Sequence, residues 1–156
     1  MTRIQVQADA FDVGKEWTDL RAELGGQSGA VAAFCGMVRD RFEGEEVANL
    51  VLEHYPGMTE KSIEAITNEA CRRWPLDALV VIHRVGEMAP GDEIVLVLAA
   101  SGHRADAFAG CEFVMDYLKT RAVFWKKERS AAGERWVSTL ASDYHRATEW
   151  DPPCPK

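Results

Sequence analysis

The chain has 156 residues, of which 47% are hydrophobic and 28% charged, a composition typical of a globular protein with a sizeable core. Eighteen basic residues against twenty-five acidic ones leave a net charge of −7, which argues against general binding to nucleic acid or to an anionic membrane. No apolar run resembles a signal peptide or approaches the ~20 residues of a membrane span, so we expect a cytoplasmic protein.

The expected organisation is one domain over residues 1–150, followed by a flexible tail, 151–156. The four cysteines lie far apart without a C-x-x-C pair, so they indicate thiols that are buried or incidental rather than a zinc site or a disulfide framework. We therefore expect neither a metal nor another cofactor.

The first third of the chain alternates strand and helix patterns. A short strand is expected at 3–7, and an amphipathic helix at 13–24 follows Asp12 and ends at the break "GGQSG". The small-residue apolar run "AVAAFCGMV" (30–38) predicts a buried strand. An acidic loop, "DRFEGEE", then leads to a further strand at 47–55.

A helix at 59–74 comes next, with Thr59 as the expected N-cap and Pro75 as its stop. Residues 76–86 and 92–100 form an expected hairpin around the turn "EMAPGD". A third helix is predicted at 101–119, because four apolar residues step by three and four and should rest on a sheet: Phe108, Cys111, Met115 and Leu118.

The segments "AVFWKKE" and "RWVST" indicate a second hairpin joined by "RSAAGE". Strands and helices intermix without a regular βαβ rhythm. The predicted fold class is therefore α+β, a two-layer sandwich in which helices pack on a largely antiparallel sheet.

The stretch from 119 to 129 carries five basic residues against Glu128, a local balance of +4 in an acidic chain. Ending the helix near Thr120 places Lys126 on the next strand, on the same side as Phe124 and Glu128. Repulsion and partial burial both favour a neutral amine, so one lysine here could act as a nucleophile or in proton transfer. A lysine cluster alone favours the alternative, a solvated basic strand edge.

Two other places carry basic residues beside strand ends. His103 and Arg104 fall at the start of the third helix, where an anion would relieve their conflict with the helix dipole; Ser101 as a simple N-cap is the alternative. Gly36 interrupts a strand and Arg39 follows it, which indicates either a closely approaching ligand or a β-bulge with a surface arginine. Together the three places suggest a phosphorylated small molecule as ligand.

Five segments resemble the family of large, catalytic subunits of molybdopterin synthase, the MoaE family, in the family's order over roughly residues 30 to 137. They are "FCGMVRD", "LEHYPGMTEKSIEAI", "RWPLDALVVIHRVGEMAPGDEIV", "SGHRADAF" and "FVMDYLKTRAVFWKKE". The resemblance implies the MoaE-like α/β hammerhead fold. Composition and periodicity do not lead to this family.

The resemblance also implies an activity and partners. Cyclic pyranopterin monophosphate receives two sulfurs and becomes molybdopterin, a dithiolene. The sulfur donor is a small ubiquitin-like subunit whose C-terminal Gly-Gly carries a thiocarboxylate, and two large subunits form the homodimeric core of a heterotetramer. The implied protein is a sulfurtransferase.

Carried over by motif, Lys119 and Lys126 match the two catalytic lysines. The resemblance also assigns substrate contacts to both lysines and to Met37, Val38, Arg39, His103, Arg104, Lys127 and Glu128. This chain departs from the pattern at two positions. Val123 stands where relatives carry proline, and Leu140 stands where some members place a basic residue that reaches a neighbouring subunit's site.

Two rival functions remain open. The first is a non-catalytic phosphate- or anion-binding scaffold, against which both lysines argue because phosphate binding alone would tolerate arginine. The second is an enzyme that acts on another phosphorylated heterocycle through a lysine Schiff base.

Overall fold

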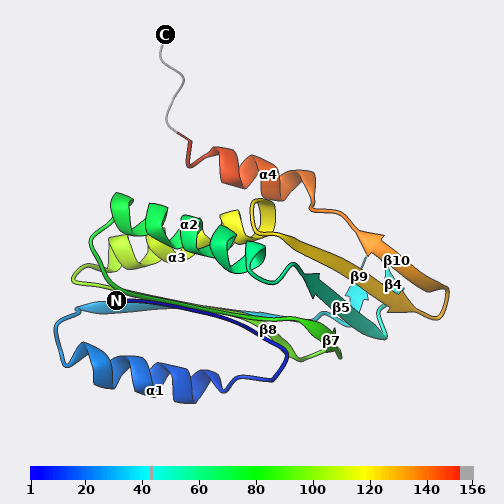
Figure 1. Cartoon of the computed structure of the whole chain (residues 1–156), viewed down its shortest axis with the longest axis horizontal. Coiled ribbons are helices and arrows are strands. Elements are labelled where there is room, and N and C mark those ends of the chain that lie inside the picture. The colour runs from blue at the N-terminus through cyan, green and yellow to red at the C-terminus, as the bar shows by residue number, and fades with distance from the viewer. Residues whose placement is uncertain (43, 152–156) are drawn as a thin grey trace, which may run out of the picture.

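The computed structural model describes residues 1–42 and 44–151, arranged as four helices and two four-stranded sheets (Figure 1). The helices are α1 (Val13–Leu24), α2 (Met58–Arg73), α3 (Arg104–Thr120) and α4 (Ala141–Thr148). The first sheet has the order β1-β6-β8-β2, and only β1 and β6 run parallel. Its strands are β1 (Thr2–Gln7), β6 (Leu76–Arg84), β8 (Glu93–Ser101) and β2 (Ala30–Met37).

The second sheet has the order β10-β9-β5-β7 and is antiparallel throughout. Its strands are β10 (Gly133–Val137), β9 (Phe124–Ser130), β5 (Asn49–His54) and β7 (Gly86–Met88). A two-stranded ribbon pairs β3 (Arg41–Phe42) with β4 (Glu45–Glu46). The predicted α+β class and the largely antiparallel pairing are confirmed. The strands, however, divide between two sheets.

The first sheet is buried on both faces because β6 and β8 are apolar at consecutive positions. Residues such as Val81 and Val97 face α2 and α3. Their sequence neighbours, such as Ile82 and Leu98, face α1 and surround Leu20. Figure 1 shows α1 below this sheet and the other helices above it. Helix α1 therefore adds a layer that the expected two-layer arrangement lacked.

Helix α1 begins and ends as the sequence predicts. The side chain of Asp12 accepts a hydrogen bond of 2.9 Å from the backbone N–H of Lys15, and Gly25 ends the helix in the left-handed region at φ 56°. The predicted cap of α2 is wrong. Gly57 is the N-cap, and its N–H donates to Glu60.

Thr59 is instead fully buried and links α2 to the segment between α3 and β9. Its Oγ1 accepts from the backbone N–H of Tyr55 at 3.0 Å and donates to the backbone oxygen of Val123 at 2.7 Å. The N–H of Val123 donates to Oγ of Ser62, also on α2, at 3.3 Å. Helix α2 thus holds both the N–H and the carbonyl oxygen of Val123 through the hydroxyls of Thr59 and Ser62. A buried hydroxyl such as that of Thr59 needs hydrogen-bond partners, and the backbone of Val123 supplies one.

The apolar stripe of α3 differs from the prediction at Phe108, which is exposed. Ala107 and Gly110 take the buried positions in this half of the helix, where a Cβ added at Gly110 would approach the Leu76 side chain to 2.9 Å. Small residues therefore let α3 lie close to β6, and Phe108 turns outward. Cys111 and Leu118 are buried as expected, and Met115 is partly buried.

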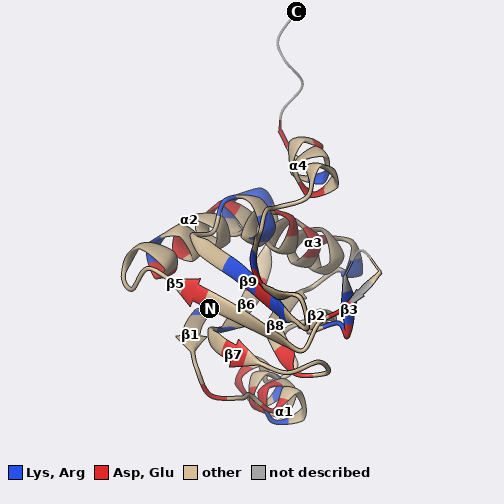
Figure 2. Ribbon diagram, turned by 90° about the vertical axis from the view of Figure 1, so that its right-hand side faces the viewer, with Lys and Arg blue, Asp and Glu red and all other residues tan. Residues whose placement is uncertain are grey.

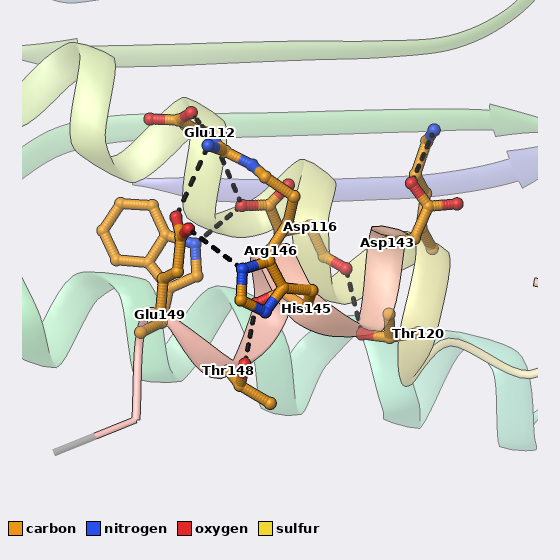
Figure 3. A network of polar contacts seen from close by, with 10 residues as sticks. Glu112, Asp116, Thr120, Asp143, His145, Arg146, Thr148 and Glu149 are labelled. Atoms are coloured by element: carbon orange, nitrogen blue, oxygen red, sulfur yellow. Dashed lines mark hydrogen bonds and ion pairs between the residues drawn. The ribbon is translucent and has the colours of Figure 1, made fainter. Parts of the chain in front are cut away.

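Helix α4 was not predicted and packs on α3, where a network of charged groups holds it (Figure 3). Arg146 pairs with Glu112 and lies 3.6 Å from Asp116, whose other partner is Nε1 of Trp150 at 2.7 Å. Asp151, the first residue of the expected tail, accepts a hydrogen bond from Tyr117 at 3.3 Å. The rest of that tail, 152–156, lies outside the described residues.

Candidate active site

A cavity of about 640 Å³ lies between β2, β9, the C-terminal half of α3 and the segment that leads into α4. Buried apolar side chains form its inner part, and both predicted catalytic lysines, Lys119 and Lys126, line it. This volume is within the range of small-molecule sites. The walls come from distant parts of the chain, so the cavity exists only in the folded protein.

The two lysines reach the cavity from different elements, as the sequence predicted. Helix α3 ends at Thr120, so Lys119 stands in its last turn, whereas Lys126 lies on β9. Phe124 lines the same cavity, because alternate residues of a strand share a face. Basic residues along β9 are visible as blue segments in Figure 2.

The environment of Lys126 lowers the pKa of its amine. Burial lowers the pKa of this amine, and the positive charges of Arg39 and Lys119 lower it further. Glu128 opposes the shift with its carboxylate, 3.8 Å from Nζ of Lys126. The three basic groups line the same cavity and act on one another electrostatically.

Lys119 is held by α4 rather than by burial. Its Nζ lies 3.4 Å from Oδ1 of Asp143, a pair that Figure 3 shows at the end of the α3–α4 network. Oγ1 of Thr139 donates to the backbone oxygen of Lys119 at 3.2 Å. Leu140 and Tyr144 of the same segment line the cavity. The C-terminal segment thus forms one wall of the cavity and positions a lysine in it.

A smaller cavity of about 40 Å³ adjoins the first, since Met37, Arg39 and Lys126 line both. Val38 and Glu128 complete the predicted residues around it. Glu128 is buried, and its carboxylate also lies 3.4 Å from Arg135 on β10. Five of the predicted substrate contacts therefore gather beside Lys119.

Packing within the chain, rather than a ligand, accounts for the glycine at position 36. A Cβ at this position would come within 2.8 Å of Val95 and 3.3 Å of the Phe34 ring, and the register between β2 and β8 shifts between Gly36 and Met37. The bulge alternative is therefore correct, and side chains of the same chain make the close approach.

Three predicted contacts do not line this cavity in a single chain. His103 is the N-cap of α3 and Arg104 its first residue, so they lie about 24 Å along the helix from Lys119. Lys127 faces the other side of β9, where its Nζ lies 4.6 Å from the centre of the Trp136 ring and 3.3 Å from Glu134. Its sequence neighbours point into the site, and a one-residue step on a strand reverses the face.

Sequence reasoning also missed cavity residues. Asp143 and Tyr144 belong to α4, whose eight residues have no side-chain cap and only one buried position, Ala147. His83 lies in an apolar strand and also lines the cavity. The only sequence feature that could have indicated a functional role is a titratable side chain within a segment of otherwise apolar core residues.

The described cysteines Cys35, Cys71 and Cys111 are free thiols, and Cys154 lies outside the described residues. Within 1–42 and 44–151, no group of three potential metal ligands occurs, and no helix is both long and apolar enough to cross a membrane.

The fold and the cavity define a small α+β protein with basic groups clustered around a cavity, one of them a lysine whose pKa is lowered. The model of the MoaE protein family matches residues 6–121. The chain belongs to this family.

Named relatives agree with this assignment. A molybdopterin synthase catalytic subunit of Ralstonia nicotianae is 53% identical over 150 residues, covering 96% of this chain and 85% of the relative. One of Vibrio cholerae is 52% identical over 149 residues, covering 96% and 98%. The solved structure of the MoaE protein from Burkholderia ambifaria superposes with a TM-score of 0.82 at 51% identity, covering 96% and 98%.

Proposed function

We propose that the protein is the catalytic subunit of a molybdopterin synthase, the name its relatives carry. It would convert cyclic pyranopterin monophosphate to molybdopterin by inserting two sulfurs. The observation that supports this most is the meeting of Lys119 and Lys126 from separate elements in one cavity of suitable size. An anion-binding scaffold has no use for a lysine whose pKa is lowered, because it would lose positive charge there.

The residues divide the work between charge and proton transfer. Arg39 and Lys119 are suited to the phosphate and to the thiocarboxylate, since both ligands are anionic. Lys126, held towards the neutral amine, is suited to take a proton or to attack the acyl carbon when the acyl–sulfur bond breaks. Glu128 lies 3.8 Å from the amine of Lys126, and Asp143 lies 3.4 Å from that of Lys119, so each amine has a carboxylate beside it.

The sulfur donor in this proposal is a small ubiquitin-like subunit with a thiocarboxylated Gly-Gly terminus. Such a tail has no side chains to grip, so backbone hydrogen bonds, a narrow channel and charges aimed at its terminus must hold it. The basic stretch 119–129 supplies those charges in an acidic protein, and its attraction should weaken with salt. We also infer that the complex works in the cytoplasm.

His103 and Arg104 enter the proposal through a second copy of the chain. Strand β2 is an edge of its sheet, and its first residues adjoin the start of α3, where a Cβ at Gly29 would meet the Gly102 oxygen at 2.4 Å. Antiparallel pairing of two β2 edges would place the start of one strand beside the end of the other. One copy's His103 and Arg104 would then approach the other's Arg39.

The deciding experiment supplies the protein with the thiocarboxylated partner and cyclic pyranopterin monophosphate, and measures dithiolene formation. We expect product only when all three components are present. Binding of the pterin phosphate without product would favour the scaffold. A borohydride-trapped adduct between Lys126 and the pterin, without the partner, would favour the Schiff-base enzyme.

A further inference from the structure

His83 lies at the inner end of the cavity, and none of the roles above uses it. On β6 it shares a face with Val81, towards α2 and α3. Its ring stacks on Phe124 of β9 with 4.0 Å between ring centres and 22° between planes. Only 8% of the residue is exposed, yet it lines the cavity. The ring is therefore oriented by packing and has one accessible part.

The hydrogen bonding of His83 determines its tautomer. Nδ1 lies 2.9 Å from the backbone oxygen of Arg84, and a carbonyl oxygen can only accept, so Nδ1 carries the proton. Burial lowers the pKa of the imidazole to about 4, so the ring is neutral near pH 7. Nε2 consequently carries a lone pair and no proton.

That lone pair faces the cavity. In the described part of the chain, the only buried side-chain nitrogen or oxygen atoms without a partner are Arg3 Nε and Arg84 Nε, and the ring of His83 makes no other hydrogen bond. Nε2 is therefore neither sealed nor bonded to the protein. It is an acceptor positioned for a ligand.

The surroundings indicate which kind of ligand group would use it. The inner cavity is lined by buried apolar side chains such as Leu52, Val95 and Leu118, whereas Lys119 and Tyr144 lie at an exposed rim. The carboxylates of Asp143 and Glu128 already face cations. A flat ring can enter between apolar walls while its anionic group stays at the rim, and an N–H on its leading edge then needs a neutral acceptor.

We propose that Nε2 of His83 accepts a hydrogen bond from a ring or amino N–H of the heterocyclic substrate, and so determines which edge of the ring enters the cavity. The identity of that ring as a pterin rests on the proposed function. His83 is in this view a substrate-contacting specificity residue, and it disfavours rings that present a bare acceptor at this edge, because two facing lone pairs would remain unsatisfied.

Two variants separate this role from packing. His83→Asn keeps an amide N–H where Nδ1 donates to Arg84 but lacks Nε2, whereas His83→Gln places an amide near Nε2. We expect His83→Asn to weaken calorimetric binding of cyclic pyranopterin monophosphate by roughly tenfold and His83→Gln to weaken it less, because in His83→Asn the N–H of the substrate would be buried without an acceptor. Affinity for inorganic phosphate, which binds at the rim, should be equal in all three proteins.

A second measurement uses the unaltered protein. With nitrogen-15 in its histidines, the Nε2 resonance of His83 should move when the pterin monophosphate saturates the site and stay in place with inorganic phosphate. An unmoved resonance, or His83→Asn binding the pterin as tightly as wild type, would overturn the proposal. If the wild-type protein binds no pterin phosphate at all, the proposed function is wrong, and the role proposed for His83, which rests on that function, is wrong as well.

Discussion

The two ends of α3 both carry basic residues, but they differ in how much of a site one chain builds around them. At the C-terminal end, Lys119 is held by Asp143, faces the cavity and acts electrostatically on Lys126. At the N-terminal end, His103 and Arg104 are exposed and line no part of that cavity.

This difference shows that basic residues at helix ends have to be judged by what surrounds them. The C-terminal end has cations beside the final carbonyls, where the helix dipole favours them, together with cavity walls from several other elements. The N-terminal end has cations where the dipole opposes them, beside an unpaired strand edge. In our proposal, the second end becomes a site only against another copy of the chain.

The largest effect should come from Lys119→Ala at the completed end of α3. Because this side chain is half exposed, the variant should fold normally, yet product formation should fall by at least about a hundredfold with the loss of a positive charge at the anionic ligands. Lys61→Ala, an exposed lysine on α2, is the control and should keep wild-type turnover. Turnover of Lys119→Ala within about threefold of wild type, a change of under ~0.7 kcal/mol in the barrier, would show that the assignment is wrong.

The N-terminal end of α3 should contribute to binding of the pterin phosphate. Arg104→Ala should raise the dissociation constant of the pterin phosphate by roughly tenfold, since a charge-assisted hydrogen bond is lost. Arg121→Ala is the matched control, because Arg121 also lies at an end of α3 but pairs with Asp151. Unchanged affinity in Arg104→Ala, measured by calorimetry, would remove this end from the site.

A mixture of variants tests whether two chains share the site. Lys119→Ala and Arg104→Ala chains, co-expressed with different tags, should form mixed dimers that have one intact site and one doubly altered site. Random pairing would then restore about a quarter of wild-type activity, because half the dimers have one of two sites intact. If mixing restores nothing while mixed dimers are isolated, each site lies within one chain.

The charged residues around Lys126 predict that two substitutions should change the pKa of this lysine in opposite directions. Glu128→Gln removes a carboxylate that raises the pKa of Lys126, so the pKa should fall; Arg39→Ala removes a cation that lowers it, so the pKa should rise. Carbon-13 NMR of the lysine side chains reports both shifts. A common direction in the two variants would contradict the described geometry.

The same shift links Lys126 to stability. Its pKa is lower in the folded chain than the usual 10.5, so between the two values the unfolded state binds more protons. The contribution of Lys126 to the free energy of unfolding should therefore increase with pH across that window. Lys126→Met should flatten this part of the profile in urea unfolding, and an unchanged slope would contradict the shift.

The smallest effect concerns the anchor of Lys119. Asp143→Asn should change turnover by a few fold and the free energy of unfolding by under ~1 kcal/mol, because Lys119 is half exposed and solvent screens the pair. Glu112→Gln, which alters the contact with Arg146 in the same network, should leave turnover unchanged. Equal effects on turnover in the two variants would mean that α4 acts by docking alone.

Local patterns predicted most elements of the fold. The strands, α1 with its Asp12 cap, and α3 with its end at Thr120 follow from periodicity, capping and turn residues. Long-range choices could not be predicted in this way. The parallel pairing of β1 with β6 and the passage of β7 into the second sheet depend on partners distant in sequence. Thr59 shows the same limit, because its partner at Val123 lies sixty-four residues away.

The candidate site was predictable where chemistry and spacing act together. The local balance of +4 singled out the stretch that carries Lys119 and Lys126, and the resemblance to the MoaE family then implied the catalytic role of these two lysines. The opposite orientation of Lys127 depends on the twist and register of β9, and the roles of Asp143 and His83 depend on contacts with other elements. Leu140 lines the cavity of its own chain and adds an apolar wall to it.

The backbone of Val123 limits how the site can move. This residue lies between the end of α3 and the start of β9, and α2 holds both its N–H and its carbonyl oxygen. The segment that joins the two lysine-bearing elements therefore cannot serve as a hinge without breaking buried hydrogen bonds. The distance between the backbones of Lys119 and Lys126 should stay constant through turnover, and any opening of the cavity should occur on the side of α4.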